Sequence, residues 1–149
     1  MTPSILVRTK TRLIGLSLQM SLATNKTQEL WSSFMPRRKE VEGKLSSEFY
    51  SLQIYPAEFM HGRFGPKTPF IKWAGVPVNE EAAIPAGMAE FRIPAGKYAM
   101  FTHKGTAQEF RQTWQQIYDQ WLPQSGYQLR EAPHFEILGE WYKGYDNPE

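Results

Sequence analysis

The chain has 149 residues, a length typical of one domain that can bury a core without disulfides or metals. It contains no cysteine, which excludes disulfides, a thiolate nucleophile and cysteine-ligated zinc, and which fits a reducing, cytoplasmic compartment. Its 17 basic and 15 acidic residues leave a formal charge of +2, too small and too scattered to predict a nucleic-acid partner. The N-terminus does not read as a signal peptide, and no apolar run is long enough to span a membrane.

The first segments of the chain predict strand and then helix. Residues 5–22 alternate imperfectly and predict one long strand or two, broken near Gly15. Asn25 and Gln28 have the spacing of a capping box, and apolar residues at helical spacing continue to Val41. The first helix is therefore expected over residues 27–41.

Two β-rich segments follow, residues 49–55 and 70–78, and predict a hairpin. The loop between them is rich in glycine and proline and is long enough to form a rim or lid. Two further β-rich runs, 88–93 and 98–103, are separated by a Pro-Ala-Gly turn that reads as a hairpin device.

The second half repeats the order of the first. Thr106 and Glu109 have capping-box spacing before an apolar helical stripe, which predicts a second helix over residues 107–121, and residues 134–142 predict a last strand. Trp31 and Trp114 occupy matching positions in the two helices. The pattern predicts an α+β fold in one domain, 1–149, with two strand-helix-strand units, one antiparallel sheet and a ligand groove at the pseudo-twofold axis.

Several strings together resemble a known family. These are IPAGKYAMFTHKG at residues 93–105, the TW of the second helix, WLPQSGYQL at 121–129 and PHFEIL at 133–138. They are similar to the effector-binding domain of the GyrI-like family, which also occurs attached to AraC-type and MerR-type transcription activators. The LW-x-x-F helix and the WAGVPV strand fit too, so the resemblance covers nearly the whole chain.

The resemblance implies a tandem strand-helix-strand-strand fold whose central groove binds amphipathic, cationic or aromatic compounds. The family's acidic groove residue, in the FE of the late strand, maps onto Glu136. Two departures from the family stand out. The chain enters its first strand too early for an upstream helix-turn-helix. The sequence ends soon after Tyr145, where the family has one more apolar strand, so either the sequence is truncated or another segment covers that edge. Similar stand-alone members include drug-sequestering proteins carried on integron gene cassettes, and others are hydrolases that use a glutamate with a tyrosine.

Glu136 is the central candidate because an acid placed mid-strand among aromatic residues must be solvated, paired or reserved for a cationic ligand. The alternation of side chains along the predicted strand is compatible with Glu136 on a solvated face or on the wall of the groove. The aromatic candidates can be core or groove, and Tyr50, Tyr55 and Tyr142 could offer a hydroxyl to the ligand. The expected ligand-binding set is Glu136, Trp73, Tyr98, Phe101, Trp114, Trp31, Tyr50 and Tyr142.

Other chemistry finds no motif. His61, His103 and His134 lie on different segments without metal-ligand spacing, so no metal is expected, and no dinucleotide, Walker or serine-elbow motif predicts a cofactor or a triad. The sequence therefore predicts a cytoplasmic protein that binds small aromatic, cationic compounds, without direct nucleic-acid or membrane binding and with a regulatory protein as a further partner. The alternative is a small-molecule hydrolase that uses Glu136 with a tyrosine.

Overall fold

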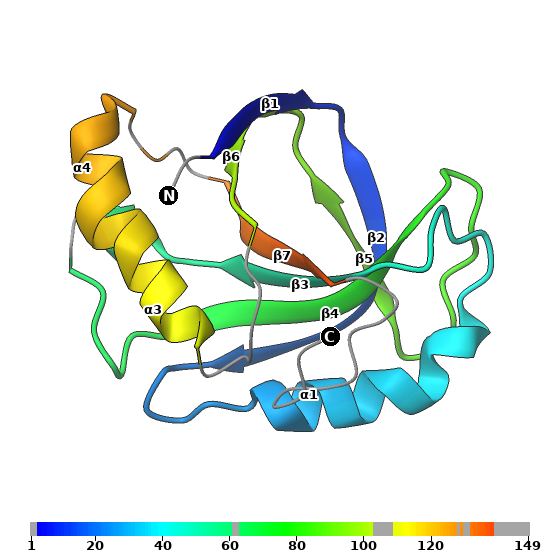
Figure 1. Ribbon diagram of the computed structural model, residues 1–149. Coiled ribbons are helices and arrows are strands. Elements are labelled where there is room, and N and C mark those ends of the chain that lie inside the picture. The colour runs from blue at the N-terminus through cyan, green and yellow to red at the C-terminus, as the bar shows by residue number, and fades with distance from the viewer. Residues whose placement is uncertain (1–2, 61–62, 103–108, 128, 130–131, 139–149) are drawn as a thin grey trace. The chain divides into compact units, whose positions relative to one another are not determined.

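The computed structural model describes residues 3–60, 63–102, 109–127, 129 and 132–138 (Figure 1). The chain divides into two compact units. The larger unit contains residues 10–94 and 131–140, and the smaller contains residues 1–9, 95–130 and 141–149.

The larger unit is built on a five-stranded sheet in the order β5-β2-β4-β3-β7, with every pair antiparallel. The central strands β2 and β4 pair over their whole length, and β3 and β4 form the predicted hairpin neighbours. The connection between β3 and β4 carries one short helix, α2. The bounds are β2 Thr11–Met20, β3 Phe49–Ile54, α2 Ala57–Met60, β4 Phe70–Val78, β5 Ala89–Ile93 and β7 His134–Leu138.

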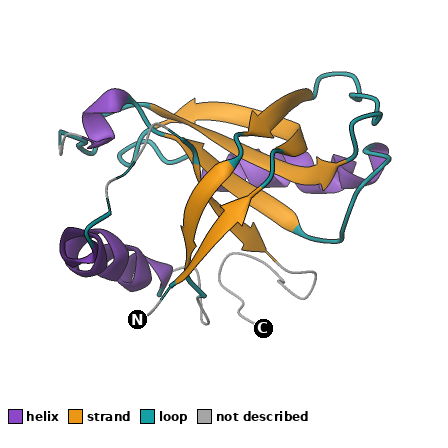
Figure 2. Cartoon of the chain, turned by 90° about the horizontal axis from the view of Figure 1, so that it is seen from above, coloured by secondary structure: helices purple, strands orange, loops and turns teal. Residues whose placement is uncertain are grey.

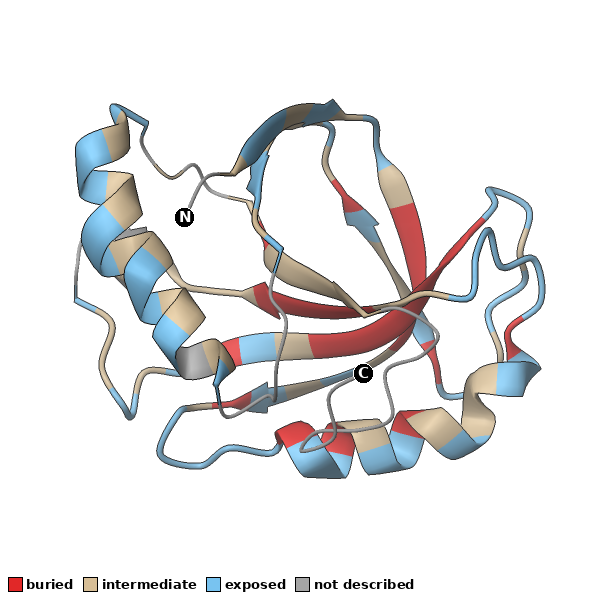
Figure 3. Ribbon diagram, in the orientation of Figure 1, coloured by how far each residue is buried: buried red, intermediate tan, exposed pale blue. Residues whose placement is uncertain are grey.

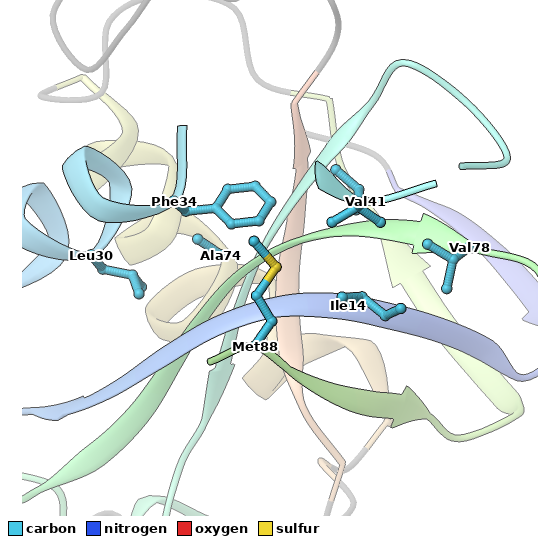
Figure 4. Packing of buried hydrophobic residues seen from close by; sticks show 8 residues of the cluster. Ile14, Leu30, Phe34, Val41, Ala74, Val78 and Met88 are labelled. Atoms are coloured by element: carbon cyan, nitrogen blue, oxygen red, sulfur yellow. The ribbon is translucent and has the colours of Figure 1, made fainter. Parts of the chain in front are cut away.

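One helix covers a face of this sheet. α1 (Thr27–Phe34) runs along β2 and β4 and continues into a 3₁₀ turn, η1 (Met35–Glu40) (Figure 1). Leu30 and Phe34, one turn apart, are almost fully buried against the sheet. The core that they join gathers apolar side chains from β2, β4, the helix and the residues next to η1 and β5 (Figures 3 and 4): Ile14, Leu30, Phe34, Val41, Ala74, Val76, Val78 and Met88.

Two local expectations in this unit are wrong in detail. The chain does not break at Gly15, which lies inside β2 and pairs with Gly75. A side chain at Gly15 would overlap the carbonyl oxygen of Ala74, so glycine there permits a close approach of two strands. The predicted capping box is also absent, because Asn25 Oδ1 accepts a hydrogen bond from the Thr27 backbone N–H at 2.9 Å.

The smaller unit contains a two-stranded antiparallel sheet of β1 (Ser4–Arg8) and β6 (Gly96–Met100). It also contains one continuous helical rod, visible end-on in Figure 2, made of α3 (Phe110–Gln115), the π-helical η2 (Gln116–Trp121) and α4 (Leu122–Ser125). Gly126 ends the rod with a φ of 79°. Thr106, the predicted cap, lies outside the described residues.

The predicted α+β class, the antiparallel strands and the two principal helices are confirmed. The expected hairpin of residues 88–93 with 98–103 is wrong, because β5 pairs with β2 and β6 pairs with β1. The strands also form two sheets where one was expected. The groove between repeats stays a prediction. No described helix is both long and apolar enough to cross a membrane.

Candidate functional site

Glu136 lies in the middle of β7, on the face of the sheet that α1 covers. Directly paired residues of antiparallel strands point to the same face, and Glu136 pairs with Ser51, which pairs with Ala74. Ala74 belongs to the core beneath Leu30 and Phe34. The carboxylate is therefore on the helix-covered side, half-buried, and not on an open solvated face.

Two polar side chains of β3 hydrogen-bond this carboxylate. Gln53 donates from Nε2 to Glu136 Oε1 at 3.3 Å, and the hydroxyl of the paired Ser51 donates as well. Burial raises the pKa of Glu136, and this effect exceeds the lowering by the charge of Lys72 and by the two hydrogen bonds. The protein therefore compensates the charge of Glu136 only in part.

Lys72, on β4, is the cation whose charge acts on Glu136. It pairs with Gln53 on the same face, and its Nζ donates to Thr27 Oγ1, at the start of α1, at 3.2 Å. Among the described residues, it forms no direct ion pair with Glu136. Burial lowers the pKa of Lys72, and the negative charge of Glu136 raises it partway back.

An aromatic cluster of Tyr55, Phe59, Phe64, Phe70 and His134 lies beside these charges. The Tyr55 ring stacks on Phe59 with centroids 4.3 Å apart and meets Phe64, Phe70 and His134 at 5.1 to 5.3 Å. His134 pairs with Gln53, so the cluster shares the face of Glu136. The arrangement places a ring surface next to an incompletely compensated carboxylate.

The titratable members of the aromatic cluster stay uncharged at neutral pH. Burial lowers the pKa of His134 to about 4. Burial raises the pKa of the Tyr55 phenol, and the negative charge of Glu136 raises it further. The second effect shows that Tyr55 lies within electrostatic reach of Glu136.

Two predicted site residues lie on the opposite face of the sheet. Trp73 pairs with Leu52, and Tyr50 pairs with Ile137. Leu52 and Tyr50 are the neighbours of Ser51, the partner of Glu136, so their side chains and those of their partners point to the other face. Trp73 packs against Phe91 at 5.7 Å and is 8% exposed. Tyr50 is 4% exposed and stacks on Phe135 at 5.6 Å. The expectation that Trp73 points into the same cavity as Glu136 is therefore wrong.

The other candidates are placed as follows. Trp31 lies half-buried on α1, edge-on to Phe34 and Phe49 at 6.1 and 6.2 Å. Tyr98, Phe101 and Trp114 belong to the smaller unit, where Phe101 contacts Trp121 at 5.1 Å and Trp114 contacts Tyr118 at 4.4 Å. A shared pocket of these three residues with Glu136 stays a prediction. Tyr142 lies outside the described residues.

Sequence reasoning missed Lys72, Gln53 and most of the aromatic cluster. Lys72 and Glu136 are on strands far apart in the chain, so no local pattern joins them. Two open hollows lie elsewhere. One of ≈ 610 Å³ is lined by Arg63, residues 65–69 and Ala23, and one of ≈ 410 Å³ by glutamines and Trp121 of the helical rod. Neither is lined by Glu136.

Comparison with known proteins identifies the family of the chain. The family described as "GyrI-like small molecule binding domain" matches residues 1–143. The chain belongs to this family. Among curated proteins, the GyrI-like chain is 35% identical over 120 residues to the transcriptional regulator BrlR of Pseudomonas aeruginosa, covering 80% of this chain and 42% of that protein. A DNA gyrase inhibitor of Erwinia billingiae is 40% identical over 77 residues, covering 45% and 48%. The GyrI-like chain thus spans less than half the length of either relative.

Solved structures share the fold. A putative bacterial transcription regulation protein from Staphylococcus aureus MU50 matches with a TM-score of 0.65 at 14% identity, covering 91% of this chain and 84% of that one. The protein SAV2435, solved bound to tetraphenylphosphonium, matches with a TM-score of 0.61 at 16% identity, covering 91% and 81%. At these identities the likeness shows a common fold.

Proposed function

We propose that this GyrI-like chain binds small amphipathic, aromatic cations, with Glu136 as the counter-charge and the aromatic cluster as the stacking surface. The observation that carries the proposal is the half-buried carboxylate of Glu136, which has no cation in direct contact among the described residues. An aromatic cation beside it gains a Coulombic attraction in a partly desolvated site. Ring faces add about 0.5–2 kcal/mol per cation–π contact.

Two findings support this ligand class. The family is one of small-molecule binding domains, and a fold neighbour was solved with tetraphenylphosphonium, an aromatic cation. The proposal extends to an effector-binding or sequestering role in the cytoplasm, in which the ligand is returned unchanged. A regulatory protein partner that responds to the ligand belongs to the same proposal.

The experiment is a titration that follows tryptophan fluorescence, using tetraphenylphosphonium as the cation and triphenylphosphine oxide as a neutral aromatic. Glu136→Gln keeps the size and the hydrogen-bonding capacity of the side chain and removes its charge. It should weaken the cation by roughly 1–3 kcal/mol and leave the neutral compound unchanged. Glu81→Gln, at an exposed glutamate, is the matched control and should change neither affinity.

Two results would contradict the proposal. An equal loss of affinity for both compounds means that Glu136 supports the fold of the site and does not distinguish charged from neutral ligands. No loss for the cation means that another group provides the counter-charge.

A second function, hydrolysis of a small molecule, is favoured by one observation. Tyr55 lies within electrostatic reach of Glu136, and the raised pKa of Glu136 suits a general base. The two functions differ in the fate of the ligand. A hydrolase forms product in excess over protein, and Tyr55→Phe should abolish that turnover, whereas a binding protein returns the compound intact.

A further inference from the structure

We propose that Lys72 is a charge-selectivity residue of the Glu136 site. It acts as a resident cation that favours the ionised carboxylate in the empty protein and opposes any cationic ligand that approaches it. Removing the charge of Lys72 should therefore tighten the binding of cations and leave neutral aromatic ligands unaffected. This inference rests on the function proposed above, because it requires ligands to bind at Glu136.

The strand register joins the two charges through one side chain. Lys72 pairs with Gln53, and Gln53 donates to Glu136 Oε1 at 3.3 Å. Glu136 itself pairs with Ser51, one row further along the same face. The ammonium and the carboxylate thus belong to one face, on the two strands that flank the strand of the buried Gln53. They form no ion pair among the described residues, yet each charge acts on the other through space.

The surroundings of Lys72 offer its ammonium group few of the hydrogen-bond acceptors and counter-charges that a purely structural lysine needs. Its ammonium has three N–H donors, and within the described part of the chain the Thr27 hydroxyl accepts one of them, at 3.2 Å. Thr27 is the first residue of α1, where the helix dipole disfavours a positive charge. Glu136 is the group that stabilises the charge of Lys72 at this position. The lysine and the glutamate therefore depend on each other when no ligand is bound.

A bound cation changes this balance. Two positive charges would then share one carboxylate in a partly desolvated space, and the repulsion between them weakens binding. A neutral aromatic compound that uses only the ring surface adds no charge and is not affected by Lys72. The lysine consequently sets the preference between the two classes of ligand.

The same coupling predicts a pH dependence. A cation at Glu136 favours the uncharged form of Lys72, so cation binding should strengthen at alkaline pH and release protons. His134, with a pKa of about 4, and Tyr55, whose pKa is raised, do not mimic that step. Burial also raises the pKa of Glu136, so its own deprotonation adds to the rise, and variants of Lys72 separate the two contributions. The charged residues at the start of α1, Lys26 and Glu29, are exposed.

The test uses the full chain with tetraphenylphosphonium and triphenylphosphine oxide. Lys72→Met keeps an apolar stem without charge and should bind the cation about tenfold more tightly, with no change for the neutral compound. It should also lose the alkaline rise in cation affinity. Lys72→Arg keeps a charge that does not titrate, so it should bind the cation no better than the wild type and lack the alkaline rise.

Thr27→Val is the control for a structural role, because it removes the hydrogen bond of Lys72 and keeps its charge. It should lower the melting temperature without favouring the cation over the neutral compound. If Lys72→Met leaves the cation affinity unchanged, or changes both ligands equally, the inference is overturned. Should that variant fail to fold, calorimetry of the wild type and Lys72→Arg at alkaline pH in two buffers of different ionisation enthalpy decides: proton release on tetraphenylphosphonium binding that Lys72→Arg lacks supports the inference, and equal release by both proteins overturns it.

The outcome separates the two proposals. If Glu136→Gln weakens the cation while Lys72→Met has no effect, the binding function stands and the role of Lys72 fails. If Glu136→Gln has no selective effect, the binding function itself fails and so does the inference that rests on it.

Discussion

Glu136→Gln should stabilise the protein at neutral pH even though it weakens cation binding. Burial raises the pKa of Glu136 despite the help of Lys72, Gln53 and Ser51, so the ionised form is less favourable in the folded chain than in the unfolded one. A neutral glutamine of the same size removes that cost. The gain should be on the order of 1 kcal/mol, limited because the site is only half-buried and because Lys72 loses its counter-charge.

The pH dependence of this gain follows from the direction of the pKa shift. A group whose pKa is raised by folding contributes stability through its protonated form, and that contribution is complete below the unfolded pKa of about 4.3 and is lost as pH rises through the folded pKa. The mutant and the wild type should thus have equal stability in acid. The advantage of the glutamine should appear as pH rises and reach its full value once Glu136 is ionised in the folded chain.

The assay is urea denaturation of both proteins at several pH values without ligand, with Glu81→Gln as a control for loss of an exposed carboxylate. A destabilised Glu136→Gln at neutral pH would refute the reasoning. It would mean that the carboxylate is a structural counter-ion of Lys72 and is not held ready for a ligand.

Three further outcomes test the fold around the site. Tyr55→Leu should cost about 2–4 kcal/mol of stability and weaken the binding of cationic and neutral aromatic ligands alike. Tyr55→Phe should keep both the stability and the affinities, as measured by denaturation and titration. Gly15→Ala should cost about 3 kcal/mol or more, because its methyl group would overlap the Ala74 carbonyl; normal stability in a melting experiment would show that β2 and β4 do not approach closely there. Trp73→Phe should lower stability without changing the ratio of cation to neutral affinity, and a selective loss of the cation would place Trp73 in the binding site after all.

The sequence by itself determined the elements whose signals are local. A short apolar run that ends before Asn79 located β4 over residues 70–78, as observed, and helical spacing located α1. An acid in the middle of an aromatic strand also singled out Glu136 without any structure. The family strings agreed with both the fold class and the match over residues 1–143.

Only the tertiary structure decided which side chains share a face. Alternation along one strand fixes which residues of that strand point the same way, but not how its phase relates to the next strand. Trp73 was therefore expected beside Glu136, and the pairing of Leu52 with both Trp73 and Phe135 puts it on the other side. The same limit hid the aromatic cluster, whose rings come from the residue after β3, from α2, β4 and β7, and from the loop before β4.

Strand partners and close approaches are equally non-local. The turn at residues 94–96 looked like a hairpin, yet β5 and β6 pair with strands from the N-terminal part of the chain, because pairing depends on which edges are free in the assembled sheet. Gly15 looked like a strand break because its backbone freedom is a local property, whereas its role follows from the carbonyl of Ala74 on the neighbouring strand. The coupling of Lys72 to Glu136 has the same origin. Two charges 64 positions apart in sequence interact because three strands align them on one face, and register is a property of the folded sheet alone.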